Sequence, residues 1–237
     1  MANSAATLTL SGLSVLYAGK PALTGIDASI SPGQSLAIAG ANGAGKTSLL
    51  GAVAGLIPST GNVYVNDEPL ASTIQARLLA GIRLVPEHRK IYPTLSVDEN
   101  LIVAHRTRGE VAKDDVFQWF PRLAERRRTL GGNLSGGEQQ MLAIGMAILG
   151  SPKILLLDEP TLGLSVPVIQ DLAERLKALR NALNLTLVVA ESDVTWLPIL
   201  SESALVLDRG LPVKRMDDYS AETLQKIENL MVGLEAA

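Results

Sequence analysis

A glycine-rich run in the first quarter of the chain has the residue types that bind phosphate groups. Residues 40–47 read GANGAGKT and fit the pattern G-x-x-x-x-G-K-[ST]. Glycines in such a run let consecutive backbone N–H groups turn inward around phosphate oxygens. Lys46 would reach the β- and γ-phosphates of a nucleotide, and the Thr47 hydroxyl would bind Mg²⁺. The run therefore predicts a nucleotide site formed by Gly40, Asn42, Gly43, Ala44, Gly45, Lys46, Thr47 and Ser48.

A second candidate lies where an apolar run ends in two carboxylates. Residues 154–157 read ILLL, which is typical of a buried strand, and Asp158 and Glu159 follow directly. At the carboxyl edge of a sheet, Asp158 would hold Mg²⁺ through water and Glu159 would polarise an attacking water. A carboxylate pair after a strand can also cap a helix, so this segment alone leaves both interpretations open.

A third candidate is the run LSGGEQQ at residues 134–140, which opens a helix expected from Glu138 to Leu149. A Ser-Gly-Gly start makes it a second anion-binding helix N-terminus in one chain. One nucleotide does not need two such sites from the same subunit, whereas two chains packed head to tail would use both. The order of the three motifs resembles that of the ATP-binding cassette (ABC) ATPases, and the resemblance covers nearly the whole chain.

This resemblance implies an ATPase that uses ATP and Mg²⁺ and pairs with a second ABC ATPase subunit. It implies catalytic roles for Glu159, Lys46, Glu87 and Ser192, and metal binding by Thr47, Asp158 and Glu87. It also implies that Ser135, Gly136, Gly137 and Glu138 bind the γ-phosphate of ATP held by the partner. The loop Leu162–Ser165 would cross the dimer interface, with Ser165 where many relatives carry Asp.

Tyr17 lies about 30 residues before Lys46, where the family places an aromatic residue that stacks on adenine. Aromatic residues make up only 3% of the chain, so an aromatic residue at this spacing favours a nucleotide contact. The alternative is a half-buried strand tyrosine with no ligand.

Two positions depart from the common pattern of the family. Glu87 stands where most relatives have a glutamine that touches Mg²⁺ or the attacking water, and Ser192 occupies the position of the switch histidine. A serine hydroxyl reaches about 3 Å less far, so we expect it to act on the γ-phosphate only through water. Ser192→Ala should then change the rate little. These departures leave open a module that binds ATP but hydrolyses it weakly, against which the intact Lys46 and Glu159 argue.

The runs PEHRK at residues 86–90 and FPRL at residues 120–123 are similar to the branch that imports branched-chain amino acids, amides or urea. The resemblance implies multi-spanning permease subunits as partners and, indirectly, a periplasmic solute-binding protein. It places the chain at the cytoplasmic face of the inner membrane, held there through the permease. We expect His88–Asn100 to dock a cytoplasmic helix of the permease, with an ordinary surface loop as the alternative.

The composition of the chain argues against several other classes of protein. The chain has 237 residues, a formal net charge of −3 and no cysteine. Weak acidity argues against a nucleic-acid binder, which usually shows a basic face. A soluble ABC ATPase acting on nucleic acid or ribosomes would usually carry long insertions or a second cassette, and the sequence contains neither. The longest uncharged stretch holds only nine consecutive apolar residues, 49–57, and a spanning helix needs about 20.

The elements that must position these motifs follow from hydrophobic patterning. Strand patterns occur at residues 8–17, 36–39, 62–66, 82–85, 154–157, 185–189 and 204–207, and helical spacing is clearest over residues 168–183. Residues 122–128 also predict a charged helix, and the tail after Asp217 predicts two short ones. Alternation of strands and helices predicts a mainly parallel sheet.

The resulting prediction is an α/β fold, a P-loop ABC-type nucleotide-binding domain over residues 1–237. It would have a mainly parallel sheet core, an antiparallel β subdomain, and a helical subdomain at about 88–149 inserted into the RecA-like core.

Overall fold

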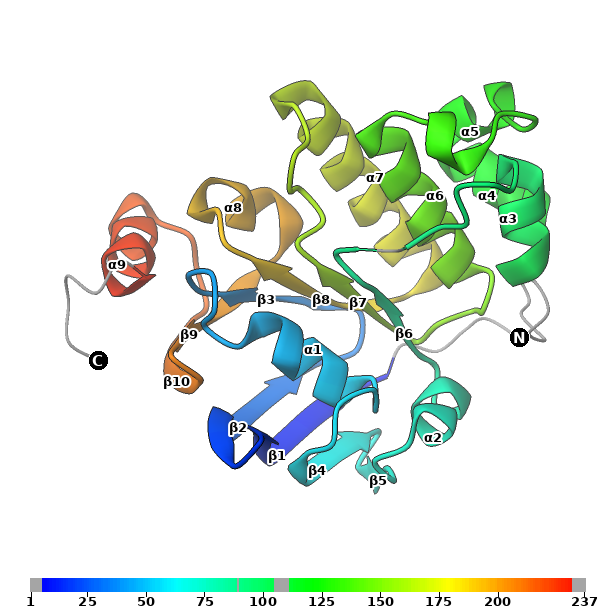
Figure 1. Cartoon of the computed structure of the whole chain (residues 1–237). Helices are drawn as coiled ribbons and strands as arrows, with labels where there is room; N and C mark the ends of the chain where they lie inside the picture. Colours follow the sequence, from blue (N-terminus) through cyan, green and yellow to red (C-terminus); the bar gives the residue numbers. More distant parts are fainter. Residues whose placement is uncertain (1–5, 89, 105–110, 232–237) are drawn as a thin grey trace.

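Two β-sheets organise the computed structural model, which describes residues 6–88, 90–104 and 111–231 (Figure 1). Within these residues, one sheet has the strand order β10-β9-β3-β8-β7-β6 and the other has the order β2-β1-β4-β5. In the first sheet all neighbouring strands are parallel except β10, which is antiparallel to β9, whereas the second sheet is antiparallel throughout.

The strands are β1 Leu8–Tyr17, β2 Lys20–Ile30, β3 Ser35–Ala39, β4 Thr60–Val65, β5 Glu68–Pro69, β6 Ile82–Val85, β7 Ile154–Asp158, β8 Thr186–Glu191, β9 Ser203–Asp208 and β10 Leu211–Met216. The α-helices are α1 Lys46–Val53, α2 Ile74–Leu79, α3 Val97–Ala104, α4 Lys113–Trp119, α5 Pro121–Glu125, α6 Gly136–Ile148, α7 Val166–Leu183, α8 Leu197–Leu200 and α9 Ala221–Met231. Two 3₁₀ turns are present at Gly131–Asn133 and Val194–Trp196.

The central strands β3, β7 and β8 are buried along their whole length. Their sequences are nearly continuous apolar runs, as expected for parallel strands covered on both faces. Each short run must therefore place its first polar residues at the carboxyl edge of the sheet, where the strand ends and the chain emerges.

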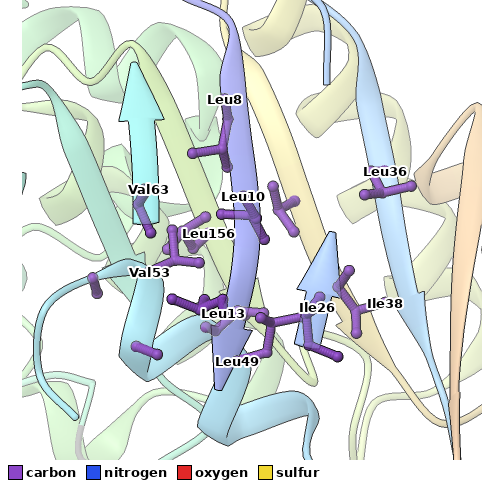
Figure 2. Packing of buried hydrophobic residues seen from close by; sticks show 14 of the residues in the cluster. Leu8, Leu10, Leu13, Ile26, Leu36, Ile38, Leu49, Val53, Val63 and Leu156 are labelled. Atoms are coloured by element: carbon purple, nitrogen blue, oxygen red, sulfur yellow. The ribbon is translucent and has the colours of Figure 1, made fainter. Parts of the chain in front are cut away.

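Helix α1 fills the space between the two sheets (Figures 1 and 2). Leu49 and Val53 of this helix belong to one buried cluster with Leu13 and Ile26 of the antiparallel sheet and Leu156 of β7. Full burial of one such aliphatic side chain stabilises the fold by about 1.5–3 kcal/mol. This packing fixes the N-terminus of α1 relative to the ends of β3 and β7.

The opposite face of the parallel sheet is covered by α6 and α7, with α3, α4 and α5 packed beyond them (Figure 1). The helices α3 to α6 all lie between β6 and β7 in the chain. Helix α9 packs near β9 in a third, smaller cluster that includes Ile227 and Leu230. No helix in the described part of the chain has the length and apolar character needed to cross a bilayer.

The predicted fold class is confirmed, and so are the seven predicted strand regions, with shifts of a few residues. Besides the two-residue β5, strands β2 and β10 were missed. Exposed residues interrupt both, and β2 also contains Gly25 in the left-handed region. Their patterns are therefore too polar and irregular for a periodicity argument.

The prediction of a charged helix over residues 122–128 is confirmed for residues 122–125, which lie in α5, and wrong for the last three residues. The basic triplet Arg126–Arg128 follows α5 as a turn and is not on a helix. There the Arg127 guanidinium lies 4.4 Å from the Phe117 ring centroid and pairs with Asp98 at 3.3 Å. These tertiary contacts replace the continued helix. Of the two helices predicted after Asp217, the described residues contain one, α9, and the residues after 231 lie outside the described part of the chain.

Candidate functional site

Four parallel strands lead into four of the predicted site segments at the same edge of the sheet. β3 leads into the glycine-rich run, β6 into Glu87, β7 into Glu159 and β8 into Ser192. β3 and β7 lie on either side of β8, so their carboxyl ends are neighbours. Residues up to 152 positions apart in the chain therefore meet because of strand order.

The backbone of the phosphate loop depends on its glycines. Gly45 has a φ of 104°, in the left-handed region, and a Cβ there would lie 2.7 Å from Leu23 Cδ2 and 2.9 Å from the Ala22 carbonyl oxygen. A Cβ on Gly40 would lie 2.7 Å from the Leu207 carbonyl oxygen. Both positions therefore exclude a side chain, and α1 can begin directly at Lys46 without a side-chain cap.

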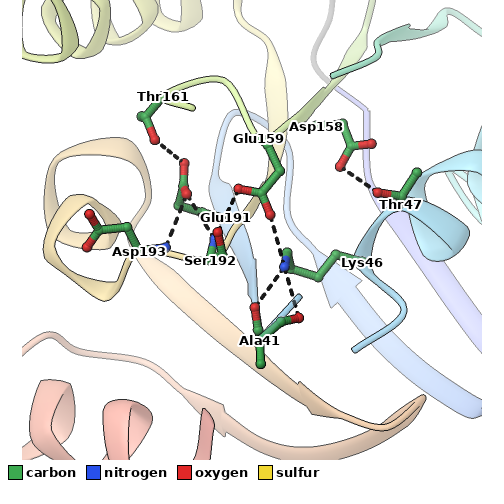
Figure 3. A network of polar contacts seen from close by, with 10 residues as sticks. Ala41, Lys46, Thr47, Asp158, Glu159, Thr161, Glu191, Ser192 and Asp193 are labelled. Carbon is green, nitrogen blue, oxygen red and sulfur yellow. Dashed lines mark hydrogen bonds and ion pairs between the residues drawn. The ribbon is translucent and has the colours of Figure 1, made fainter. Parts of the chain in front are cut away.

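Lys46 is buried, with 5% of its side chain exposed, and all its ammonium hydrogens have acceptors (Figure 3). Nζ donates to the carbonyl oxygens of Gly40 at 2.7 Å and Ala41 at 3.2 Å, and it pairs with Glu159 Oε1 at 2.9 Å. A nucleotide phosphate would have to replace at least one of these acceptors. We expect the phosphate to replace the Glu159 carboxylate, because both groups are negatively charged.

Asp158 and Thr47 supply the oxygen donors that a magnesium ion would use. The Thr47 hydroxyl donates to Asp158 Oδ1 at 3.2 Å. Burial raises the pKa of Asp158, and the nearby charges of Glu159 and Glu87 raise it further. Among the described residues no cluster of three His, Cys, Asp or Glu side chains could hold a metal by itself. Mg²⁺ in nucleotide sites usually needs only one or two protein oxygens besides phosphate and water, so this donor set fits it.

Glu159 has an unusual backbone and two side-chain partners. Its φ of 46° is left-handed, a conformation that costs a non-glycine residue of order 1–3 kcal/mol. The Glu159 N–H donates to the Ala190 carbonyl oxygen at 3.0 Å, while the Ser192 hydroxyl donates to Glu159 Oε2 at 2.9 Å. With Lys46 on Oε1, both carboxylate oxygens are held (Figure 3).

This geometry adds a partner to Ser192 that the sequence did not indicate. The expected role of Ser192 was a water-mediated contact to phosphate, and that role stays a prediction. The direct contact in the structure is instead with Glu159. A histidine at this position would place a ring where the short serine side chain meets the carboxylate.

The cavity at this edge has a volume of about 750 Å³. Its lining includes the predicted residues Tyr17, Asn42, Gly43, Gly45, Lys46, Thr47, Ser48, Glu87, Glu159 and Ser192. Tyr17 is half-exposed on β1, and its hydroxyl lies 3.3 Å from Ser48 Oγ. Four further lining residues were not predicted to contact the nucleotide, namely Pro21, Ala22, Leu162 and Arg209.

The Ser135–Glu138 segment is not brought to this cavity. It forms the start of α6, where the Ser135 hydroxyl accepts from the Glu138 N–H and Glu138 Oε2 accepts from the Ser135 N–H. Ser135 and Gly136 are exposed, whereas Gly137 is buried and a Cβ there would lie 2.5 Å from Val168 Cγ1. Gly137 therefore also has a packing role between α6 and α7.

One functional candidate escaped the sequence argument altogether. Glu191, the last residue of β8, is only 2% exposed and accepts three hydrogen bonds. Burial is the main cause that raises its pKa to about 7. The sequence shows a carboxylate at the end of an apolar strand, but it does not show which residues contact this carboxylate in the fold.

A glycine-rich loop entering a helix, a buried lysine and carboxylates at the adjoining strand end define a P-loop nucleotide-binding protein. The ABC transporter family pattern matches residues 23–162, more than half of the chain. The chain belongs to this family and is an ATP-binding ATPase component of an ABC transporter.

Individual relatives are similar over nearly the full length. The chain is 34% identical over 235 residues to the high-affinity branched-chain amino acid transport ATP-binding protein BraG of Pseudomonas aeruginosa, covering 95% of this chain and 99% of that protein. It is 32% identical to the probable branched-chain amino acid transport ATP-binding protein LivF of Archaeoglobus fulgidus, covering 88% and 91%. It is 28% identical to the lipopolysaccharide export system ATP-binding protein LptB of Escherichia coli, covering 86% and 88%.

A solved nucleotide-free ATP-binding cassette from an ABC transporter has the same fold. Its TM-score is 0.86 at 18% identity, covering 98% of this chain and 99% of that one.

Proposed function

We propose that the chain powers an importer of a small polar solute, with branched-chain amino acids first and a related amide or urea second. The observation that carries this proposal is the similarity to BraG over 95% of the chain. The similarity to LivF and the PEHRK run at residues 86–90 support it. The match to LptB, which is named for lipopolysaccharide export, has lower identity over a smaller share of the chain.

In the proposed reaction, Glu159 accepts a proton from the water that attacks the γ-phosphate of ATP. The ion pair between Glu159 and Lys46 supports this role. When phosphate binds to Lys46, it would release one oxygen of the Glu159 carboxylate, which could then accept the proton of the water. Thr47 and Asp158 would hold Mg²⁺, which when bound offsets the charge of the β- and γ-phosphates. Glu87 lines the same cavity, after the strand β6 that neighbours β7, and would adjust the ion or the water.

The second half of the proposed site comes from another ABC ATPase subunit. The exposed Ser135 and Gly136 lie outside the cavity of their own chain, and Leu162 is an exposed apolar residue on its rim. Two chains packed head to tail would bring Ser135 and Gly136 of one chain onto the phosphates bound by the other. The same packing would cover Leu162.

The proposed dock for the permease is the segment His88–Asn100. Beside it lies a hollow of about 240 Å³ whose lining includes Pro86, Lys90 and Met146. The Lys90 ammonium donates to the Gln140 side chain of α6, which links this segment to the helix that starts directly after Ser135. Arg89, part of the predicted dock, lies outside the described residues. Through such a dock the chain would sit at the cytoplasmic face of the inner membrane and communicate indirectly with a periplasmic solute-binding protein.

The test is an uptake assay in a strain that lacks the gene. Uptake of labelled leucine, isoleucine and valine should fall to background, and should return with the unaltered chain but not with Glu159→Gln at equal expression. Labelled acetamide and urea, measured in the same strains, identify the related substrates. Unchanged uptake of all these solutes would contradict an import role, and a loss of surface lipopolysaccharide instead would favour export.

A further inference from the structure

Glu191 has a buried carboxyl group. Burying it costs free energy of folding, and no role in the nucleotide site described above accounts for that cost. Glu191 lies at the end of β8, and its side-chain partners in the described residues do not include a cation. Burial disfavours its charged form, and the nearby charge of Glu159 disfavours it further. An apolar residue of similar size would often be at least as stable in such a place. The retained carboxyl group therefore needs a reason other than stability.

The hydrogen bonds of Glu191 join two loops. Its Oε2 accepts from the Thr161 hydroxyl at 2.6 Å, and Thr161 follows β7. Its Oε1 accepts from the backbone N–H groups of Ser192 at 2.9 Å and Asp193 at 3.2 Å, which follow β8. Figure 3 shows the carboxyl group between these two segments.

Both segments also hold Glu159. Thr161 is two residues beyond it, and Ser192 donates its hydroxyl hydrogen to Glu159 Oε2 at 2.9 Å. Because Glu159 has a left-handed backbone, nearby contacts must maintain its conformation. Glu191 fastens the chain on the C-terminal side of Glu159 to the segment that orients its carboxylate.

We propose that Glu191 is a positioning residue for ATP hydrolysis, which sets the orientation of Glu159 by tying Thr161 to the backbone of Ser192 and Asp193. The inference rests on the proposed role of Glu159 as the base. Glu191 itself does not line the nucleotide cavity, so its loss should affect the chemical step and leave nucleotide binding nearly intact.

Four variants of the full chain test the link. Glu191→Leu and Thr161→Val remove it and release the backbone that follows Glu159, so each should lower kcat at least about tenfold, more than Ser192→Ala, while KM for ATP stays within about twofold. Glu191→Gln and Thr161→Ser preserve it, because a glutamine oxygen accepts the two N–H groups and its amide donates to Thr161. These two variants should keep kcat within about threefold of the unaltered chain.

The matched control is Thr186→Val, at the opposite end of the same strand. Thr186 is fully buried, and its hydroxyl donates to the Ala6 carbonyl oxygen at 2.6 Å. This variant should lower the thermal midpoint and leave kcat per folded chain unchanged. A merely structural role for Glu191 predicts the same outcome for Thr161→Val, so equal behaviour of the two threonine variants would overturn the inference.

Two further measurements separate the possible failures. Glu159→Gln should remove most turnover; if it does not, the proposed base is wrong and the inference falls with it. If Glu159→Gln is inactive but folded Thr161→Val has normal kcat, the inference alone is wrong. The double variant Glu191→Leu/Thr161→Val should be no slower than the slower single variant, and losses that multiply would show that the two residues do not act through one contact. Should Glu191→Leu fail to fold, Thr161→Val decides the outcome.

Discussion

Helices α1 and α6 both start at glycine-containing runs, but their first turns are completed differently. α1 starts after Gly45 with no side-chain cap, and its first residue, Lys46, lies inside the large cavity. α6 starts after Ser135, which forms a capping box with Glu138, and its first turn lies outside that cavity. Helix N-termini attract anions through free N–H groups and the helix dipole. α1 therefore offers a site within one chain, whereas α6 presents a partly satisfied and exposed end, for which we propose a ligand brought by another chain.

The largest effect should come from breaking the chemistry next to α1. Glu159→Gln should lower hydrolysis by about 10²–10⁴-fold, because general-base assistance has that magnitude. ATP binding should remain, and the ATP-bound chains should accumulate as dimers. Turnover and nucleotide affinity measured on the same preparation check both statements. Turnover within about threefold of the unaltered chain would exclude Glu159 as the base.

A somewhat smaller effect is expected on the affinity for ATP when Lys46 is replaced. Lys46→Ala removes charge-assisted contacts worth about 1.5–3 kcal/mol, so the affinity for ATP should fall by about 10–150-fold. Fluorescence titration with a labelled nucleotide measures this directly. Lys177→Ala, on the exposed side of α7, is the matched control and should bind as the unaltered chain does. Equal affinity for both variants would contradict a phosphate role for Lys46.

The buried Glu191 should give stability a pH dependence. Its pKa rises from 4.5 to about 7 on folding, so the folded chain keeps a proton that the unfolded chain has lost. Its contribution to stability is therefore full below about pH 4.5 and falls as pH rises to about 7, by up to about 3 kcal/mol.

Glu191→Gln should remove this slope, and denaturant unfolding at several pH values measures it. Glu174→Gln, on the exposed face of α7, should retain the slope of the unaltered chain. Parallel curves for the unaltered chain and Glu191→Gln would mean that Glu191 does not carry the effect.

The smallest effect should follow from Ser192→Ala. It removes one hydrogen bond to Glu159, worth about 0.5–1.5 kcal/mol, while Lys46 still holds the other oxygen. kcat should fall by less than about tenfold with nucleotide affinity unchanged. Steady-state kinetics beside Ser201→Ala, a buried serine outside the cavity, provide the check. Complete loss of turnover with ATP still bound would make Ser192 a direct catalytic contact.

The sequence was most informative where the functional residues follow one another in a short run of the chain. The GANGAGKT loop and the carboxylates after β7 are short runs whose geometry follows from their own residues. Strands β2 and β10 were missed because exposed residues interrupt their patterns.

The Glu191–Thr161 contact was missed for a different reason. The two residues are 30 positions apart and meet only because β7 and β8 are neighbours in the sheet. Pro21 and Arg209 enter the cavity in the same way, at the ends of β2 and β9, and no local pattern marks either.

The central claim is that one working site combines the α1 start of one chain with the α6 start of another. The direct measurement is ATPase activity after mixing two variants that are each inactive. Lys46→Ala removes the α1 half. Gly136→Asp places a carboxylate at the α6 half, where a Cβ has ordinary contact with Leu164 at 3.5 Å and an acidic residue suits the first turn of a helix.

A mixed dimer contains one site in which both halves are intact. Activity should therefore appear on mixing, rise with total protein concentration and approach half of that of the unaltered chain per mixed dimer. A mixture no more active than its two components would contradict the composite site, and so would full activity of Gly136→Asp alone.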